Sequence, residues 1–423
     1  MSTPPATFAR PPAPILNPFR PGAGQKPIYL AGRTQEQNEF SRMLTQSPIA
    51  QNAILTGLRG VGKTVLLDEF KPVAQGYGWL WAGNDLSESA SLTEERLARR
   101  IVVDISTALA PIFAQTVAKQ PIGFASEAIK EVRPLQFSDL WAVYEATNGL
   151  TADKLESVLL FVWNLIKDNN TISGIVFAYD EAQNLSDHAA KDEYPLSLLV
   201  DVFSRLQRTP HHCRFLLVLT GLPTLYPKLN EARTFTERMF HVMHLQRLAD
   251  DEAKAAIEKP IELTGSPIKF SDRAVSNIMQ MSAGYPYFIQ FICKEVFDAW
   301  IVRQQRGEAT TVPSSEISEK LDQDFFAPRW ARSTDRQQDF MKVVATLENS
   351  DEEFTVQEIV SASRKLLKKG FSPSHAQQIL MALAEKGLMY RSRRGGYCFA
   401  VPLLAQFIHR QTWNPASQLS RGA

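Results

Sequence analysis

The sequence has little cysteine, no long apolar run and almost no net charge. Three cysteines among 423 residues are too few and too scattered for a disulfide framework or a zinc ribbon. No stretch approaches about 20 consecutive apolar residues, which argues against a membrane span. The first residues are rich in proline and lack the apolar segment of a secretory signal. These absences favour a reducing, cytoplasmic compartment and predict no membrane partner.

The composition is that of an ordinary globular protein, with 44% hydrophobic and 22% charged residues. At roughly 100–200 residues per domain, the length predicts two or three domains. The formal net charge of +1 conceals an asymmetry, because residues 331–423 contain 13 Lys and Arg but only 8 Asp and Glu. A basic C-terminal region on a mildly acidic body favours a polyanionic partner.

Residues 28–245 predict an α/β core. Residues 1–27 before it are rich in proline, alanine and glycine and predict an extended arm. Apolar runs predict strands at Asn52–Thr56, Gly78–Ala82, Gly174–Tyr179 and Arg214–Thr220. Helical patterns lie between them at 34–44, 65–70, 93–109, 151–167 and 196–207. This alternation predicts a parallel sheet covered on both faces, with an irregular insertion at 111–150.

Two smaller domains are expected after the core. Residues 246–330 show helical patterns at 250–259, 271–282 and 286–300, which predict an all-α unit. Residues 331–412 predict three helices (335–347, 355–367 and 374–386) followed by a hairpin of 388–393 and 397–401. That order is typical of a winged helix-turn-helix, and residues 413–423 form a tail.

The strongest motif is GLRGVGKT, which matches the phosphate-binding pattern G-x-x-x-x-G-K-[ST] between a strand and a helix. The glycines permit a tight loop whose amides point inward, and the helix N-terminus adds partial positive charge. Lys63 is expected on the β- and γ-phosphates, and Thr64 on Mg²⁺. The expected nucleotide-binding residues are Gly57, Leu58, Arg59, Gly60, Val61, Gly62, Lys63, Thr64 and Val65.

A second motif, IVFAYDE, places two carboxylates directly after an apolar strand. Asp180 would lie at the carboxyl edge of the sheet, where the Mg²⁺ of a phosphate-binding loop is held. Glu181 would activate water for attack on the γ-phosphate. This Walker B pair favours ATP hydrolysis over mere storage of the nucleotide.

Together these motifs resemble those of the AAA+ ATPases and the related STAND NTPases, in particular the replication-initiator clade. The predicted fold class is accordingly a P-loop NTPase sheet with an α-helical lid and a C-terminal winged helix. The segment Gly32-Arg33-x-x-Glu36 resembles an entry motif of that clade. The resemblance implies that Arg33 lies near the adenine, and it covers residues 28–410.

The resemblance implies further site residues. Thr220 ends the fourth strand where relatives carry a sensor for the γ-phosphate, although an ordinary strand-end threonine explains it too. Arg238 lies where relatives present an arginine finger to a neighbouring subunit. Arg233 competes for that role, and a surface pairing of Arg238 with Glu237 or Glu231 explains it equally well.

The lid departs from the AAA+ pattern. Its third helix opens with Ala283-Gly284-Tyr285-Pro286, which resembles the nucleotide-sensing Gly-x-Pro of STAND proteins. Helix initiation by a proline at the first helical position is the alternative interpretation of Pro286. The departure puts ring assembly in doubt, because STAND proteins often switch between nucleotide states instead of turning over quickly.

Residues 364–394 are the candidate surface for double-stranded DNA. The second half of the winged helix carries a predicted recognition helix with Ser374, His375, Gln377 and Gln378 near its exposed start. Basic residues precede the helix and lie in the wing: Arg364, Lys365, Lys368, Lys369, Arg391, Arg393 and Arg394. The alternative is a winged helix that contacts protein or packs on the core.

The sequence therefore predicts a Mg²⁺-dependent ATPase that couples its nucleotide state to DNA engagement. The principal alternative is a nucleotide-gated signalling or defence switch with a protein partner, and a homo-oligomer fits either function. A DNA-binding regulator with a degenerate ATPase is disfavoured, because no Walker residue is missing.

Overall fold

The computed structural model describes residues 15–22, 24–119, 129–208, 210–307, 311–350, 352–392 and 395–412. The chain divides into two compact units. The first, here called the lid unit, comprises Met1–Gly32 and Arg247–Pro328. The second, the core unit, comprises Arg33–Gln246 and Arg329–Ala423. Each unit is described by itself.

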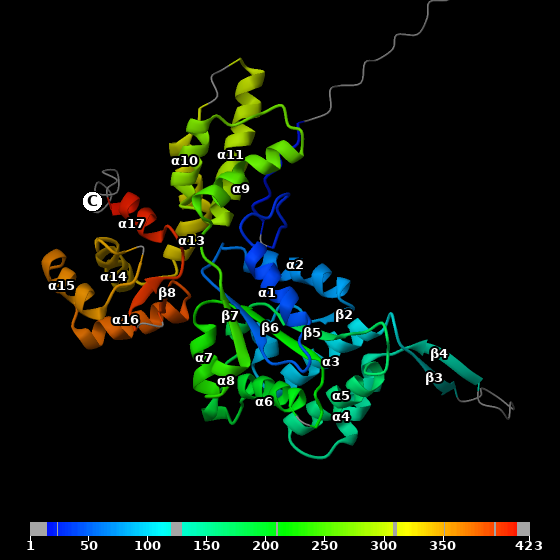
Figure 1. Ribbon diagram of the computed structural model, residues 1–423. Helices are drawn as coiled ribbons and strands as arrows, with labels where there is room; N and C mark the ends of the chain where they lie inside the picture. Colours follow the sequence, from blue (N-terminus) through cyan, green and yellow to red (C-terminus); the bar gives the residue numbers. More distant parts are fainter. Residues whose placement is uncertain are drawn as a thin grey trace, which may run out of the picture. The chain divides into compact units, whose positions relative to one another are not determined.

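The core unit contains a five-stranded parallel sheet in the order β2-β5-β6-β1-β7 (Figure 1). The strands are β1 Asn52–Thr56, β2 Trp79–Ala82, β5 Gly174–Tyr179, β6 Phe215–Gly221 and β7 Phe240–His244. The four strands predicted from the sequence are present, and the predicted α/β fold class is confirmed. The fifth strand, β7, was not predicted. It pairs with β1 from Asn52↔Phe240 onward at one edge of the sheet, and His241 and His244 interrupt its apolar residues.

Helices cover both faces of the sheet. On one face Ile54, Phe177 and Leu217 join a buried core with α3 Glu94–Leu109, α5 Thr151–Ile166 and α6 Pro195–Gln207. Complete burial of such side chains stabilises the fold by about 1.5–3 kcal/mol each. On the other face α2, Lys63–Gly76, packs near β2 and β6. Phe70 of α2 stacks on Phe40 of α1, Thr34–Leu44, with ring centroids 4.1 Å apart.

The insertion at 111–150 is more regular than predicted. Strand β3, Ala114–Lys119, pairs antiparallel with β4, Ile129–Pro134, and helix α4, Phe137–Ala146, follows (Figure 1). Two short helices precede β7, α7 Leu225–Ala232 and α8 Thr236–Met239. Three 3₁₀ turns complete this part: η1 Glu88–Ser91, η2 Ala182–Asn184 and η3 Ala189–Lys191.

The C-terminal part of the core unit contains the predicted three helices and hairpin. The helices are α14 Asp335–Ala345, α15 Val356–Leu366 and α16 Pro373–Glu385. The hairpin pairs β8 Met389–Arg391 with β9 Tyr397–Phe399, and α17 Leu404–Thr412 follows. The side chains of Thr334, Thr355 and Ser372 cap the three helices by accepting backbone N–H bonds. We call residues 335–412 the winged-helix part.

The lid unit is helical. It contains α9 Asp250–Leu263, α10 Asp272–Ser282, α11 Pro286–Gln305, α12 Ser314–Leu321 and a π-helical segment Asp322–Phe326. The short helix α13, Ala327–Trp330, begins in this unit and ends in the core unit. Residues 15–22, within the expected arm, pack on this unit. Phe19 is 2% exposed and stacks 6.0 Å from Phe270, and Asn17 donates to Asp298 Oδ1 at 2.7 Å. In the described parts of the chain, none of the helices combines the length and apolarity needed to cross a membrane.

A buried pair of amide side chains lies at the first residue of β1. Asn52 Nδ2 donates to Gln207 Oε1 at 3.0 Å, and Gln207 Nε2 donates back to Asn52 Oδ1 at 2.8 Å. Asn52 Oδ1 also accepts the backbone N–H of Leu217 at 2.8 Å. The Asn52 side chain therefore satisfies a buried donor of β6 as well as the Gln207 amide.

Replacing Asn52 with alanine is expected to lower the free energy of unfolding by about 2 kcal/mol, because the Gln207 amide and the Leu217 N–H lose a buried partner. The measurement is the urea-unfolding midpoint of the purified chain. The matched control is Asn148→Ala at an exposed position, which should stay within about 0.5 kcal/mol of the wild type. Equal losses in the two variants would contradict the role assigned to the pair.

Candidate nucleotide-binding site

The phosphate-binding loop lies between β1 and α2, as its motif requires. Gly60 and Gly62 adopt positive φ angles of 80° and 90°, which L side chains rarely adopt. Gly62 is the N-cap of α2, and no side chain caps this helix end. The first amides of a 14-residue helix therefore remain available to an anion at the loop.

Lys63 spans the loop from the first turn of α2. Its Nζ donates to the carbonyl oxygens of Gly57 at 3.0 Å and Leu58 at 2.9 Å. Burial lowers the pKa of Lys63 from its usual 10.5 to about 8, although Asp180 and Glu181 favour its charged form. A cation held this way can bind a phosphate in the middle of the loop.

Thr64 and Asp180 meet at the carboxyl edge of the sheet. Thr64 Oγ1 donates to Asp180 Oδ2 at 2.5 Å, although the two residues lie 116 positions apart. Asp180 is 4% exposed, and burial raises the pKa of its carboxyl above the usual value. A hydroxyl and a carboxylate are the hard oxygen ligands that Mg²⁺ accepts, so these two residues fit a Mg²⁺ site.

Glu181 is exposed and lies beside this pair, in a left-handed conformation with φ 52°. Its backbone N–H donates to Asp180 Oδ1 at 2.7 Å, and its Oε2 accepts a hydrogen bond from Gln183 Nε2. Lys228 of α7 holds the same turn by donating to Gln183 O at 2.8 Å. The sequence analysis did not predict that Gln183 and Lys228 belong to the site. No motif identifies a residue two positions after the acidic pair, and the helix that carries Lys228 was not predicted.

Thr220 lies next to Asp180 on the neighbouring strand. Tyr179 pairs with Leu219, so the same register brings Asp180 level with Thr220, with both side chains on the α2 face. The Thr220 hydroxyl is buried and has no hydrogen-bond partner among the described residues. A buried orphan hydroxyl at this edge suits a polar group supplied by a ligand.

Arg33 contacts the phosphate-binding loop from outside. Its side chain is buried, and Nη2 donates to Val61 O at 3.0 Å and Gln246 O at 2.8 Å. Nη1 lies 3.4 Å from Glu36 Oε1. These contacts hold the backbone of the loop and of the segment after β7. The sequence did not predict this structural role of Arg33. The expected position near the adenine stays a prediction.

The two candidate arginine fingers differ in their surroundings. Arg233 forms an ion pair with Asp201, with Nη2 and Nε 2.6 and 2.9 Å from its oxygens, and this contact raises the Arg233 pKa. Arg238 is exposed on α8, and its side chain has no hydrogen bond or ion pair to the described residues. Arg238 is therefore the better placed of the two to reach a neighbouring molecule.

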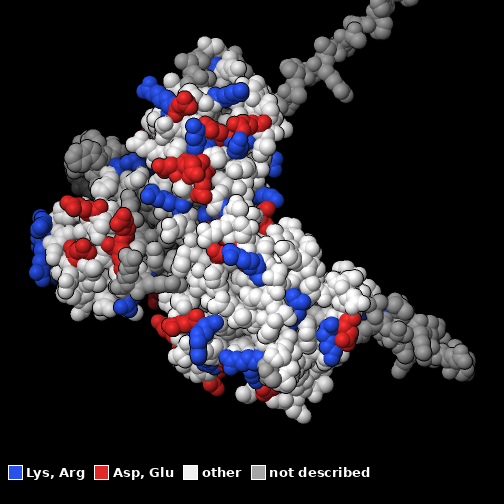
Figure 2. Space-filling model, in the orientation of Figure 1, with Lys and Arg blue, Asp and Glu red and all other residues white. Residues whose placement is uncertain are grey.

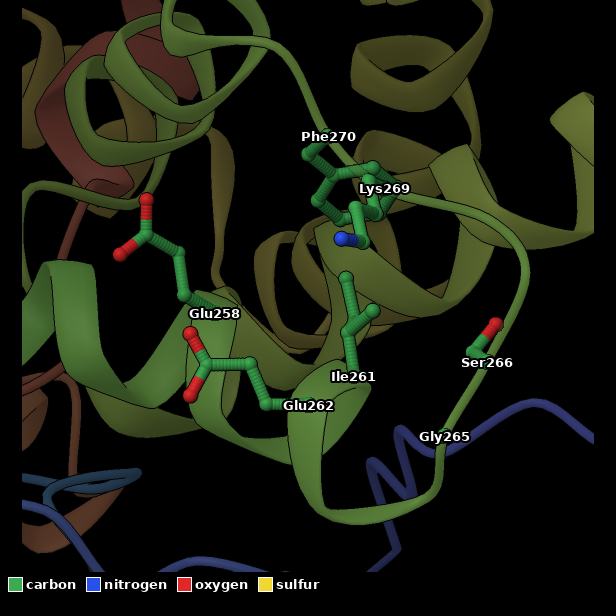
Figure 3. Close-up of a pocket in the computed structure, with 7 residues that line it drawn as sticks. All are labelled: Glu258, Ile261, Glu262, Gly265, Ser266, Lys269 and Phe270. Atoms are coloured by element: carbon green, nitrogen blue, oxygen red, sulfur yellow. The ribbon is translucent and has the colours of Figure 1, made fainter.

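Pro286 belongs to the lid unit, where it begins α11 after Ala283 and Gly284, both at positive φ. The same unit has a cavity of about 500 Å³ between α9 and residues 265–270 (Figure 3). Its lining includes Glu258, Glu262 and Lys269, and Glu262 is ion-paired with Lys259 at 2.8 Å. None of the predicted nucleotide-binding residues lines this cavity.

The winged-helix part carries basic residues at the predicted positions. Exposed basic side chains lie in the last turn of α15, directly after that helix and in the hairpin: Arg364, Lys365, Lys368, Lys369 and Arg391. Figure 2 shows positive charge along the edge of this part, whereas both signs are mixed elsewhere on the visible face. Ser374, Gln377 and Gln378 are exposed on α16, and His375 is half-buried. Arg393 and Arg394 lie outside the described residues.

The lowered pKa of Lys63 predicts a pH-dependent affinity for ATP. Below pH 8 the side chain is charged and attracts phosphate, and above pH 8 the free protein must take up a proton to do so. The dissociation constant, measured by titration calorimetry, should rise about tenfold between pH 7 and 9. Lys63→Arg remains charged throughout and should show a flatter profile. Parallel profiles would contradict a titrating Lys63.

Comparisons with known proteins bear on the fold. Residues 323–408 match a sequence family described as a domain of unknown function, DUF8462. A search of curated proteins found no match. The solved structure of the Aeropyrum pernix ORC2 protein in its ADPNP-ADP complexes has 12% identity and a TM-score of 0.51, over 95% of this chain and 98% of that chain. Its ADP form has 12% identity and a TM-score of 0.51, over 93% and 98%.

A further similar structure is the Aeropyrum pernix ORC1 protein in complex with DNA, with 13% identity and a TM-score of 0.44, over 93% of this chain and 95% of that chain. At these identities a likeness establishes the fold alone, and the ORC2 structures carry it. The chain has the mixed α/β fold of the AAA+ P-loop ATPases, and its predicted resemblance to the replication initiators is confirmed at the level of the fold.

Proposed function

We propose that this chain is a Mg²⁺-dependent ATPase of the AAA+/STAND type that couples its nucleotide state to DNA engagement. The observation that carries the proposal is the 2.5 Å hydrogen bond between Thr64 and Asp180. It joins the phosphate-binding loop to the acidic pair at one edge of the sheet. The ORC2 structures of the same fold are of ADPNP-ADP complexes and of an ADP form, which supports ATP as the ligand.

Each residue at this edge has a part in hydrolysis. The loop amides and Lys63 bind the phosphates, and Thr64 and Asp180 hold Mg²⁺. When bound, the ion neutralises charge on the phosphate oxygens. Glu181 orients the attacking water and accepts its proton.

The remaining candidates complete the site. The buried Thr220 hydroxyl donates to the γ-phosphate or the water, in line with its lack of a partner among the described residues. Arg238, which is exposed on α8, contributes a cation to a neighbouring subunit in a homo-oligomer. Pro286, which begins α11 of the lid unit, is proposed as a nucleotide-sensing residue.

DNA engagement is assigned to the winged-helix part. The support is an exposed basic group at the end of α15 and in the turn before α16, formed by Arg364, Lys365, Lys368 and Lys369. Lysine and arginine at such a turn bind backbone phosphates and position a helix on the duplex without reading its sequence.

One observation favours the second candidate function, a nucleotide-gated switch with a protein partner. The exposed face of α16 carries Gln377, Gln378 and Met381, and Met381 is 60% exposed. A neutral face with an exposed methionine suits contact with a protein, and it offers no cation to a DNA phosphate.

The steady-state rate of ATP hydrolysis, measured with and without duplex DNA at two salt concentrations, tests the proposal. Wild-type protein should hydrolyse ATP, and duplex should stimulate the rate at low salt more than at high salt. Glu181→Gln should lower kcat by about 100-fold or more, because a general base contributes roughly that factor, and should retain ATP affinity.

The double variant Lys368→Gln/Lys369→Gln separates the two candidates. It should weaken DNA stimulation and reduce the slope of log affinity against log salt by about 0.9 for each phosphate that the variant no longer neutralises. Lys254→Gln/Lys259→Gln, on α9 of the lid unit, is the matched control. If duplex DNA leaves the rate of hydrolysis unchanged at both salt concentrations, the switch replaces the DNA-coupled function. If the wild type does not hydrolyse ATP in any condition, the proposed ATPase activity and the proposed role of Glu181 are both refuted.

A further inference from the structure

Gln183 connects the two loops that carry the expected catalytic residues. It lies in η2, directly after the acidic pair, and its Nε2 donates to Glu181 Oε2. Its Oε1 accepts the backbone N–H of Leu222 at 3.0 Å. Leu222 follows Thr220 and Gly221 at the end of β6. One amide side chain thus uses its donor on the carboxylate and its acceptor on the neighbouring loop.

The surroundings of Gln183 hold this amide in place. A Cβ atom at position 221 would come within 2.6 Å of Gln183 Oε1, so glycine there makes room for the side chain. Lys228 Nζ donates to Gln183 O at 2.8 Å and to Ser186 Oγ at 2.9 Å. The backbone of the turn is therefore fixed from α7, and the amide is fixed from β6.

We propose that Gln183 is a positioning residue for Glu181. By occupying Oε2 it sets the rotation of the carboxylate and leaves Oε1 for the attacking water. As the water oxygen bonds to the γ-phosphorus, the bond to the β–γ bridging oxygen breaks, ADP leaves, and Glu181 accepts the water proton. The same amide keeps Glu181 in register with the end of β6, where Thr220 lies. This inference rests on the proposed ATPase function.

Two substitutions of Gln183 separate its contact with the Glu181 carboxylate from its contact with the loop at Leu222. Gln183→Met has a similar length and removes both hydrogen bonds. Gln183→Glu keeps an acceptor for the Leu222 N–H but replaces the donor to Glu181 with a repelling carboxylate. Both should lower kcat on the order of 10-fold while the affinity for an ATP analogue changes less than about twofold, because neither touches Lys63, Thr64 or Asp180.

A double-mutant cycle provides the second measurement. In the Glu181→Gln background, Gln183→Met should change the residual rate by less than about twofold, since a positioning residue acts through the group that it positions. The matched control is Gln35→Met, because Gln35 also donates to a glutamate, Glu39 Oε1 at 2.8 Å, on α1. This control should leave kcat unchanged.

The outcomes are distinguishable. Wild-type hydrolysis with unchanged kcat in Gln183→Met, full kcat in Gln183→Glu, or an undiminished effect in the Glu181→Gln background would each overturn the positioning role alone. Absence of hydrolysis by the wild type would overturn the proposed function and this inference with it.

Discussion

The hydrogen bond from Thr64 to Asp180 depends on the order of strands in the parallel sheet. Strand β6 lies between β1, which leads into the phosphate-binding loop, and β5, which leads into the acidic pair. Because all these strands run in one direction, their carboxyl ends meet at one edge. The first turn of α2 then reaches across to Asp180, and Thr220 is the penultimate residue of the strand between them. This topology brings Thr64 and Asp180 together, although they lie 116 residues apart along the chain.

Side-chain hydrogen bonds connect the loops at that edge of the sheet. Arg33 ties the phosphate-binding loop at Val61 to Gln246 after β7. Gln183 ties Glu181 to Leu222 after β6, and Lys228 holds the turn from α7. Functional residues in such folds often lie on loops beyond the ends of the strands. The backbone of a loop lacks the hydrogen bonds of the sheet there, so side-chain hydrogen bonds, here called anchors, fix its position. The anchors explain how an exposed glutamate keeps a fixed place beside a buried aspartate.

The inner strands and the positions of the two motifs in the fold could be predicted from the sequence, because both have strong local signals. Asn52–Thr56 and Gly174–Tyr179 are continuous apolar runs, and they are buried on both faces. Strand β7 was missed because His241 and His244 interrupt the apolar residues of its sequence, FHVMH, so Phe240–His244 shows no such run. The hairpin of β3 and β4 was missed because its strands, AQTVAK and IKEVRP, mix polar and charged residues with apolar ones and contain no continuous apolar run.

The anchors of the candidate site could not be predicted from local patterns. Gln183 and Lys228 act through contacts made only when α7 packs against η2, and no spacing rule relates them. The choice between Arg233 and Arg238 likewise needed the position of Asp201, which lies on α6 and is adjacent only in the folded chain. Sequence patterns therefore predicted the groups that we propose for the chemistry, and the fold shows which side chains contact them.

The most direct test is the effect of Mg²⁺ on ATP affinity in the wild type, Asp180→Asn and Thr64→Val. If Thr64 and Asp180 hold the ion, Mg²⁺ should tighten ATP binding by the wild type, and each substitution should remove about tenfold or more of that gain while affinity without Mg²⁺ changes little. An equal Mg²⁺ effect in all three proteins would contradict a metal site at this edge of the sheet.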